Sequence, residues 1–341
     1  MTLPQLSRSV LSAAAGIALF AGCAGSQTDG DNSGAASQVL PASRGFGFRQ
    51  SWMDPGAAGH DLLYVTNADG VVNVYRYWQH TLVGVLTSFS QPEGECADGA
   101  GNVYIADYAA KKVFEYAHGG KSTIETFDTS PYAPFGCAVN TRNGDLAVAN
   151  YYNYHQRGNI EIYRRAKGKP VIYTYPYVTG FRSVGYDNKG NLLATDGNGY
   201  SSSYFGSDFA YLPKSGIKLI GMAFCYGTSC GGSWTSVQGI QWDGKYWVFN
   251  TYNDLFRWTI ANNKSQYVDE IQLNGAYEDE MGPFWLYRQS SKATVTQVVG
   301  SSSFESRGAV FYWKYPAGGD AVDSVTKNLD APFGVAVSLK P

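Results

Sequence analysis

Short runs of alternating apolar and polar residues, separated by turns rich in glycine and asparagine, recur along most of the chain. In one example, a Gly-Asn turn at 101–102 precedes an apolar run at 103–106, and similar runs follow at 112–116 and 123–127. Alternation with a period of two predicts half-buried β-strands, and short Gly- and Asn-containing segments between them predict tight turns. The pattern therefore predicts an all-β fold.

The strands belong to a longer repeat. Each copy opens with Pro or a turn, continues through Gly, an apolar strand, a Gly-Asn turn and a second strand, and closes on Asp or Asn. The anchor positions of the copies, at the place of the Gly, are Gly94, Gly136, Ser183, Gly239, Trp285 and Gly334. The anchors lie 42 to 56 residues apart. A period of about 40 to 50 residues is typical of one four-stranded propeller blade.

The two ends of the repeat region predict how the ring closes. The region begins with a strand at 62–67 that matches the second strand of a blade, so the first blade lacks its innermost strand. It ends with a lone first strand at 334–339. We therefore predict an all-β, six-bladed β-propeller, with the ring closed by the C-terminal strand completing the first blade.

The copies at 92–107 and 134–150 carry a motif that can be written PxGxAVDxxGNxYxAD. This motif resembles the NHL-repeat and gluconolactonase-like six-bladed propellers, over roughly residues 60–341. The chain also resembles uncharacterised bacterial secreted proteins and lipoproteins with this repeat. The resemblance implies the propeller fold, but one fold hosts many functions, so it does not specify an activity.

In gluconolactonase-like enzymes, metal ligands precede the Gly that opens the innermost strand. The six matching positions here, which we predict to line the channel mouth, are Glu93, Phe135, Arg182, Gln238, Phe284 and Phe333. Only Glu93 and Gln238 offer the oxygen ligands that a divalent cation prefers. We therefore predict no metal, no cofactor and no catalytic residues at these positions. Two interpretations stay open: the mouth binds a small apolar or zwitterionic ligand, or the Phe side chains fill the channel.

The loops on the same face as these positions are rich in aromatic residues interleaved with Ser, Gly and Asn. The members that we predict to bind a ligand are Tyr151, Tyr152, Tyr154, Tyr200, Tyr204 and Trp234. Rigid amphipathic rings beside adaptable polar residues are typical of recognition surfaces. The alternative is that Tyr is simply abundant in a β-rich chain.

The first residues of the chain predict export. Arg8 precedes an apolar run at 10–20 that is too short to span a bilayer and ends in Phe20-Ala21-Gly22-Cys23. This ending resembles a bacterial lipobox, which implies lipidation of Cys23 and cleavage before it; an ordinary secretory signal is the alternative. We predict a lipoprotein-type signal peptide at 1–22, a flexible tether at 23–45 and the propeller at 46–341.

Five cysteines leave four once Cys23 is assigned to the lipid. An even number in an oxidising compartment favours disulfides. Cys225 and Cys230 lie five apart in one loop and are predicted to pair. Cys96 and Cys137 stand two residues and one residue after their anchors, so alternation turns them toward each other across neighbouring blades. We predict a Cys96–Cys137 bridge, the alternative being two buried thiols.

The charge balance argues against a nucleic acid as the partner. Against 28 acidic residues there are 26 Lys and Arg, which gives a net charge of −2 and no basic field for a nucleic acid. We expect a monomer in the cell envelope, lipid-anchored at the outer membrane or cell surface, or else secreted, that touches the membrane through its anchor only. The preferred function is a binding or scaffold module for an envelope protein or glycan, without catalysis. The alternatives are a lactonase-like hydrolase or lyase and a structural envelope-assembly protein.

Overall fold

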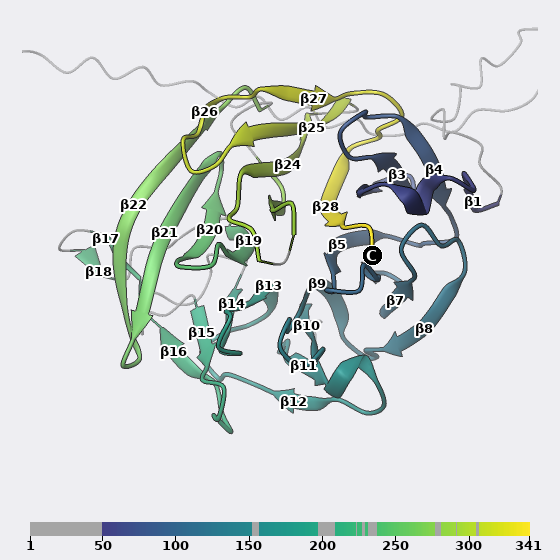
Figure 1. Cartoon of the computed structure of the whole chain (residues 1–341). Helices are drawn as coiled ribbons and strands as arrows, with labels where there is room; N and C mark the ends of the chain where they lie inside the picture. Colours follow the sequence, from purple (N-terminus) through teal and green to yellow (C-terminus); the bar gives the residue numbers. More distant parts are fainter. Residues whose placement is uncertain are drawn as a thin grey trace, which may run out of the picture. The chain divides into compact units, whose positions relative to one another are not determined.

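The computed structural model describes residues 50–151, 157–196, 209–222, 224–226, 229–230, 237–276, 281–290, 292–304 and 307–341. All of them lie in one compact unit, Gly45–Pro341. Six small sheets form a ring, each built on four antiparallel strands, so the fold is the predicted six-bladed β-propeller (Figure 1). No helix in the described ranges is long and apolar enough to cross a membrane.

Each blade runs from an inner strand at the channel to an outer strand at the rim. From the inner strand outward, the first blade consists of β28 (Pro332–Ser338), β2 (Leu62–Asn67), β3 (Val72–Arg76) and β4 (Leu82–Leu86). The second blade consists of β5 (Pro92–Ala97), β6 (Val103–Asp107), β7 (Lys112–Tyr116) and β8 (Thr123–Asp128). The third blade consists of β9 (Ala133–Val139), β10 (Leu146–Tyr151), β11 (Ile160–Tyr163) and β12 (Val171–Tyr173). The fourth blade consists of β13 (Phe181–Tyr186), β14 (Leu192–Asp196), β15 (Phe209–Leu212) and β16 (Ile220–Met222). The fifth blade consists of β19 (Val237–Trp242), β20 (Trp247–Thr251), β21 (Asp254–Ala261) and β22 (Lys264–Asn274). The sixth blade consists of β23 (Phe284–Tyr287), β24 (Gln297–Phe304), β25 (Arg307–Lys314) and β27 (Asp323–Val325).

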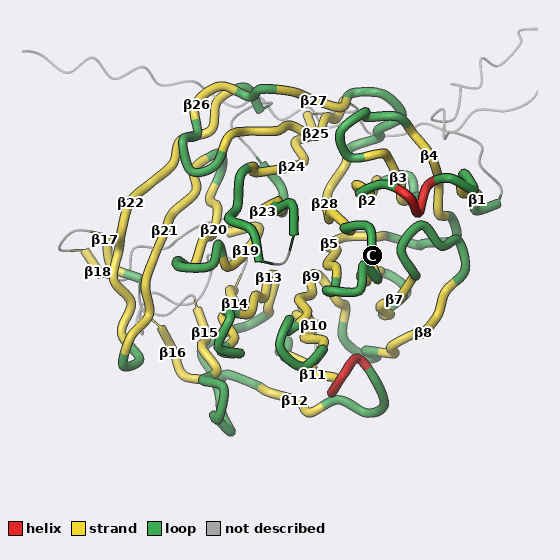
Figure 2. The backbone as a smooth tube through the Cα atoms, viewed as in Figure 1, coloured by secondary structure: helices red, strands yellow, loops and turns green. Residues whose placement is uncertain are grey.

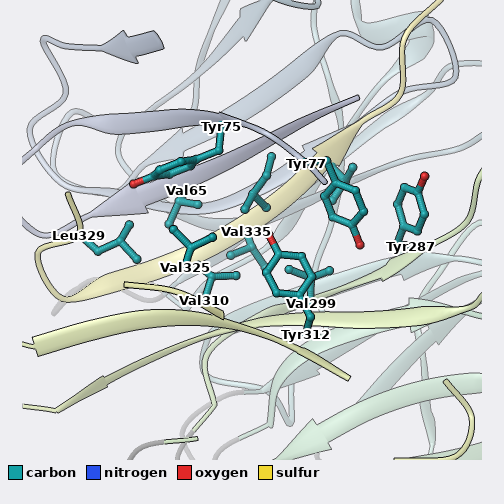
Figure 3. Packing of buried hydrophobic residues seen from close by; sticks show 12 residues of the cluster. Val65, Tyr75, Tyr77, Tyr287, Val299, Val310, Tyr312, Val325, Leu329 and Val335 are labelled. Carbon is teal, nitrogen blue, oxygen red and sulfur yellow. The ribbon is translucent and has the colours of Figure 1, made fainter. Parts of the chain in front are cut away.

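The closure prediction is confirmed. Strand β28, at the C-terminal end, pairs antiparallel with β2 and supplies the missing inner strand of the first blade. Its Val335 lies in the apolar cluster between the first and last blades, where Figure 3 shows the rings of Tyr77 and Tyr287 side by side. Those two rings stack with centroids 4.3 Å apart. The ladder therefore joins the two ends of the repeat region within the first blade, and side-chain packing joins that blade to the last one.

Several short elements lie outside the repeat and were not predicted (Figure 2). Strand β1 (Trp52–Met53) adds a fifth strand to the outer edge of β4. Strand β26 (Gly319–Asp320), which comes from the sixth blade, pairs parallel with the outer edge of β22 in the fifth. The remaining elements are two single-turn 3₁₀ segments, η1 (Ala57–Gly59) and η2 (Arg164–Ala166), and a hairpin of β17 (Cys225–Tyr226) and β18 (Ser229–Cys230).

Glycine at the anchor positions lets the inner strands approach one another closely. A Cβ atom added at Gly94 would lie 2.5 Å from the carbonyl oxygen of Phe135 in the next blade, and one added at Gly334 would lie 2.3 Å from that of Glu93. In the sixth blade, Gly282 makes this contact, with the carbonyl of Phe333. The expected anchor there, Trp285, stands three residues later, so our alignment of the sixth copy was shifted.

The predicted Cys96–Cys137 disulfide is present, with a Cα–Cα distance of 5.6 Å and a sequence separation of 41 residues. Both residues lie in the apolar cluster between the second and third blades. Alternation along the inner strands accounts for this, because neighbouring blades face each other with opposite sides of their sheets. The Cα atoms of Cys225 and Cys230 are directly opposite in the β17–β18 hairpin, but their side chains lie outside the described part. That second bridge stays a prediction.

Candidate binding site at the channel mouth

Four of the six predicted mouth residues come together. Phe333, Glu93, Phe135 and Arg182 sit near the start of the inner strands of the first four blades in ring order, β28, β5, β9 and β13. The ring of Phe135 packs edge-on against Phe333, with centroids 5.3 Å apart. The guanidinium carbon of Arg182 lies 4.6 Å from the centroid of the Phe135 ring. One half of the mouth is thus an aromatic cluster bearing a cation, and the Phe135 ring at its centre is buried.

Two tyrosines extend this aromatic surface. Tyr151, which ends β10, has its ring centroid 5.6 Å from that of Phe135. Tyr108, just after β6, packs edge-on against Phe135 at 6.0 Å. Tyr151 was predicted as a ligand-binding residue and Tyr108 was not. The repeat could have predicted the position of Tyr108, because Tyr108 follows Asp107 just as Tyr151 follows Asn150.

Glu93 places an acid beside the aromatic surface. Its side chain is buried, and Gln91 donates a hydrogen bond to its Oε1 at 2.7 Å. Burial raises the pKa of Glu93 to about 7, while the bond from Gln91 and the charge of Arg182 act in the opposite direction. The acid therefore changes its charge near neutral pH, and the net charge of the mouth changes with it.

The other two predicted mouth residues are placed differently. Gln238 is buried on β19, and its Oε1 has no hydrogen-bond partner among the described residues. Phe284 lies on β23 in the apolar cluster that joins the fifth and sixth blades. It follows Gly282 by two residues, so the shifted alignment accounts for its place in the core instead of the mouth.

Most of the predicted loop surface falls outside the part of the chain that the structure describes. Tyr152, Tyr154, Tyr200, Tyr204 and Trp234 lie outside the described residues. Of the loop-face set, Tyr151 alone is described, and its side chain is partly exposed beside Phe135. The ligand-binding role of these residues therefore remains a prediction.

Polar residues at the ends of the second strands hold the loops on this face. Asp107 accepts hydrogen bonds from the backbone N–H groups of Ser90 and Gln91, at 2.7 and 3.0 Å. Asn250 accepts one from the N–H of Gly239 and donates another to the carbonyl of Met281. Backbone bonding explains why Asp and Asn end these strands. Within the described residues, no group of three or more His, Cys, Asp and Glu could hold a metal ion.

A second acid, Glu95, lies deeper, near Thr66 and Tyr64 of the first blade. Its side chain is buried, and neither carboxyl oxygen lies within hydrogen-bond geometry of a partner among the described residues. Burial raises the pKa of Glu95 well above its usual value, and the nearby backbone N–H of Thr66 offsets this only in part. An unpaired acid in this position is neutral in the folded protein and destabilises it when it ionises.

We expect Glu95→Met to stabilise the protein and to flatten its pH dependence. The folded state retains the Glu95 proton above the ordinary carboxyl pKa of 4.5, where the unfolded chain loses it, so stability falls as pH rises. Removing an unsatisfied buried group should raise the free energy of unfolding by about 1–3 kcal/mol at neutral pH. Urea unfolding between about pH 5 and pH 8 measures both effects.

Glu125→Met, on the exposed face of β8, is the control for this substitution. It should change the free energy of unfolding by less than about 0.5 kcal/mol. A Glu95→Met protein that is no more stable than the parent and keeps the same slope with pH would contradict the assignment. Some slope should remain in the variant, because the pKa of Glu93 is also raised.

Comparison with known proteins gives the fold alone. No protein-family model matches the chain, and no curated protein matches it. Among solved structures, one titled "Crystal structure of Nidogen/Laminin Complex" is similar with a TM-score of 0.59 and 12% identity, over 82% of this chain and 99% of that one. A protein of unknown function from Bacteroides caccae is similar with a TM-score of 0.59 and 10% identity, over the same shares. These matches support a β-propeller without assigning it to the NHL or gluconolactonase-like families.

Proposed function

We propose that the protein is a lipid-anchored propeller outside the cytoplasm that binds a protein or glycan of the cell envelope. The face around the channel mouth is the binding surface in this proposal. The observation that supports it is the cluster of Tyr108, Phe135, Tyr151 and Phe333, with Arg182 over one ring. Aromatic rings beside charged and polar groups favour recognition of a partner. The similar nidogen structure was solved as a complex with laminin, so a propeller of this shape is compatible with a protein partner.

Site-specific photocrosslinking in intact cells tests the binding surface. A benzophenone amino acid replaces Tyr151, whose side chain is partly exposed at the mouth. The matched control places it at Ile124, which is 55% exposed on β8 at the rim. We expect a discrete covalent adduct from position 151 and none from position 124, detected by gel mobility and mass spectrometry. Equal labelling at the two positions, or none at 151, would contradict the proposal.

The anchor is tested separately. Cys23→Ser removes the thiol that a lipid would occupy, so the protein should move from the membrane pellet to the soluble fraction after cell lysis. The lipid on Cys23 is the only membrane anchor that we propose, so a chain without it should have nothing to retain it at the membrane through lysis in high salt. Ser26→Ala, three residues later in the predicted tether, should leave the distribution unchanged. Unchanged pelleting of Cys23→Ser would refute the lipid anchor without bearing on the binding surface.

A further inference from the structure

Positive charge is concentrated on the third and fourth blades, at the end of the propeller opposite the channel mouth. Each inner strand begins at the mouth, so the turn after it lies at the opposite end, as does the loop between the two outer strands of a blade. In these two blades the four loops are 140–145, 164–170, 187–191 and 213–219. They bear eight basic residues, all exposed, which are Arg142, Arg164, Arg165, Lys167, Lys169, Lys189, Lys214 and Lys218.

Direct contacts join these loops into one surface. Within the third blade, the backbone N–H of Arg165 donates to Oδ1 of Asp145 at 2.9 Å. Across the two blades, a Cβ atom added at Gly190 would lie 3.7 Å from Cγ of Lys214 and 3.8 Å from Cδ of Arg142, so these two side chains flank the same glycine. The eight basic residues therefore form a single patch, which we call the basic face.

The positive charge of the basic face is largely uncompensated. Its loops hold two acids, Asp145 and Asp187. Asp187 is buried and accepts hydrogen bonds from the backbone N–H groups of Lys189 and Asn191. None of the eight basic side chains forms an ion pair with a described residue. Eight positive charges against two negative ones leave a local charge of about +6, in a chain whose net charge is −2.

Exposed aliphatic side chains accompany the basic residues. Ile217 is 92% exposed, between two lysines in the loop 213–219. Val171 and Ile172 are 40% and 57% exposed at the start of β12, directly after the loop 164–170. Large apolar side chains that gather on the surface of a folded protein mark a contact surface. The basic face therefore combines positive charge with apolar groups.

An anionic lipid bilayer matches both parts of this face. Its phosphate groups attract Lys and Arg, and its hydrocarbon begins close beneath them, within reach of an aliphatic side chain at the tip of a loop. A hydrated polyanion, such as a nucleic acid or an acidic polysaccharide, would use the charges alone and leave the aliphatic side chains in water. The combination of basic and aliphatic groups therefore favours a membrane surface.

We propose that the basic face docks on an anionic membrane surface, with Ile217 entering the headgroup layer. The channel mouth then points away from the bilayer, because it lies at the opposite end of the blades. From the sequence alone we expected the anchor to be the only membrane contact, and this face is a second one. It requires neither the lipid on Cys23 nor a partner at the mouth. The docking depends on charge and is therefore weakened by salt, unlike a lipid anchor.

Co-sedimentation with lipid vesicles tests the proposal on the chain from Ala24 onward, which lacks the anchor and contains the whole compact unit Gly45–Pro341. With vesicles of about 30% phosphatidylglycerol in phosphatidylcholine, in about 0.1 M NaCl, the protein should pellet with the vesicles. Binding should fall at least tenfold on vesicles of phosphatidylcholine alone, and also on the anionic vesicles in about 0.5 M NaCl.

Charge reversal tests whether the basic face makes the contact. Lys214→Glu together with Lys218→Glu should weaken binding to the anionic vesicles at least tenfold. The matched control is Lys111→Glu together with Lys112→Glu, at two exposed lysines where β7 begins at the mouth end, and it should weaken binding less than about threefold. If the first variant does not fold, Ile217→Asp replaces it, because that side chain is almost fully exposed.

A fluorophore at the loop tip tests the contact with the bilayer. A nitrobenzoxadiazole dye on Ile217→Cys should become brighter and shift its emission to shorter wavelength on the anionic vesicles, because the dye enters a less polar layer. The matched control carries the same dye on Ile124→Cys, at the rim of the second blade, and should not respond.

Three results would overturn the proposal. They are no binding to anionic vesicles at low salt, full binding by a folded Lys214→Glu, Lys218→Glu variant, and a dye at position 217 that responds no more than one at 124. Duplex DNA and heparin provide the last comparison. If the protein binds either of them but not the vesicles, the basic face takes a polyanion and not a membrane.

Discussion

A chain that ends at Asp330, and so lacks β28, should not reach the native fold. The lost strand pairs with β2 along its length and inserts Val335 and Val337 into the cluster between the first and last blades. Each buried valine contributes about 1.5–3 kcal/mol, and the ladder to β2 is lost as well. Since a native domain is stable by about 5–15 kcal/mol in total, the deletion removes most of that margin.

The shortened chain should accumulate as insoluble protein or lack a near-UV circular dichroism signal. The control ends at Leu339, which keeps all of β28 and loses only Lys340 and Pro341. That control should fold, with a small loss from the hydrogen bond between the Lys340 N–H and Asp61. A chain ending at Asp330 that unfolds cooperatively within a few degrees of the full chain would show that closure by β28 is dispensable.

Replacing both Cys96 and Cys137 by Ala should lower the free energy of unfolding by about 4 kcal/mol. The bridge links residues 41 apart across the second and third blades, so it restricts the unfolded chain strongly. Each cysteine is also buried in the inter-blade cluster, where Ala fills the space less well. Urea unfolding of the parent and the variant, both without reductant, measures the difference.

Unfolding in the presence of reductant distinguishes the contribution of this bridge from that of the predicted Cys225–Cys230 bridge. Reductant should lower the stability of the parent by at least as much as the double substitution does, because it opens both bridges. In the double variant it should remove no more than about 2 kcal/mol, the value expected for the shorter loop. If reductant leaves the free energy of unfolding of the parent unchanged, and the Cys96→Ala, Cys137→Ala protein is as stable as the parent, the bridge does not stabilise the fold.

The repeat allowed most of the fold to be predicted, because each copy must bury the same faces of its strands against the neighbouring blades. The spacing of Gly94, Gly136, Gly239 and Gly334 predicted the ring, and alternation around Cys96 and Cys137 predicted their bridge. These features follow from strand geometry, which the residue pattern reflects directly. The sixth copy misled because its glycine, Gly282, precedes Phe284 by two residues, whereas the other copies place the aromatic or polar residue immediately before the Gly.

The elements outside the repeat had no comparable signal. Strands β1 and β26 have two residues each, and their pairing depends on where distant strands present a free edge. At the mouth, the sequence predicted four inner-strand positions that meet and misplaced Phe284, and comparison of Asp107-Tyr108 with Asn150-Tyr151 would have added Tyr108. The raised pKa of Glu93 and the isolation of Glu95 depend on burial by other blades, which the local sequence does not record.

The position of β1 determines how the propeller responds to mechanical load. A pull on the N-terminal segment enters the unit at Trp52 and Met53, which are bound to the rim strand β4 by two register pairs. These pairs would peel first, since a short edge pairing opens more easily than a full ladder. Strand β28, which closes the ring, lies at the other end of the same sheet, with β4, β3 and β2 between it and β1. Under such a pull we expect β1 to detach from the first blade while β28 stays paired with β2 and the ring stays closed.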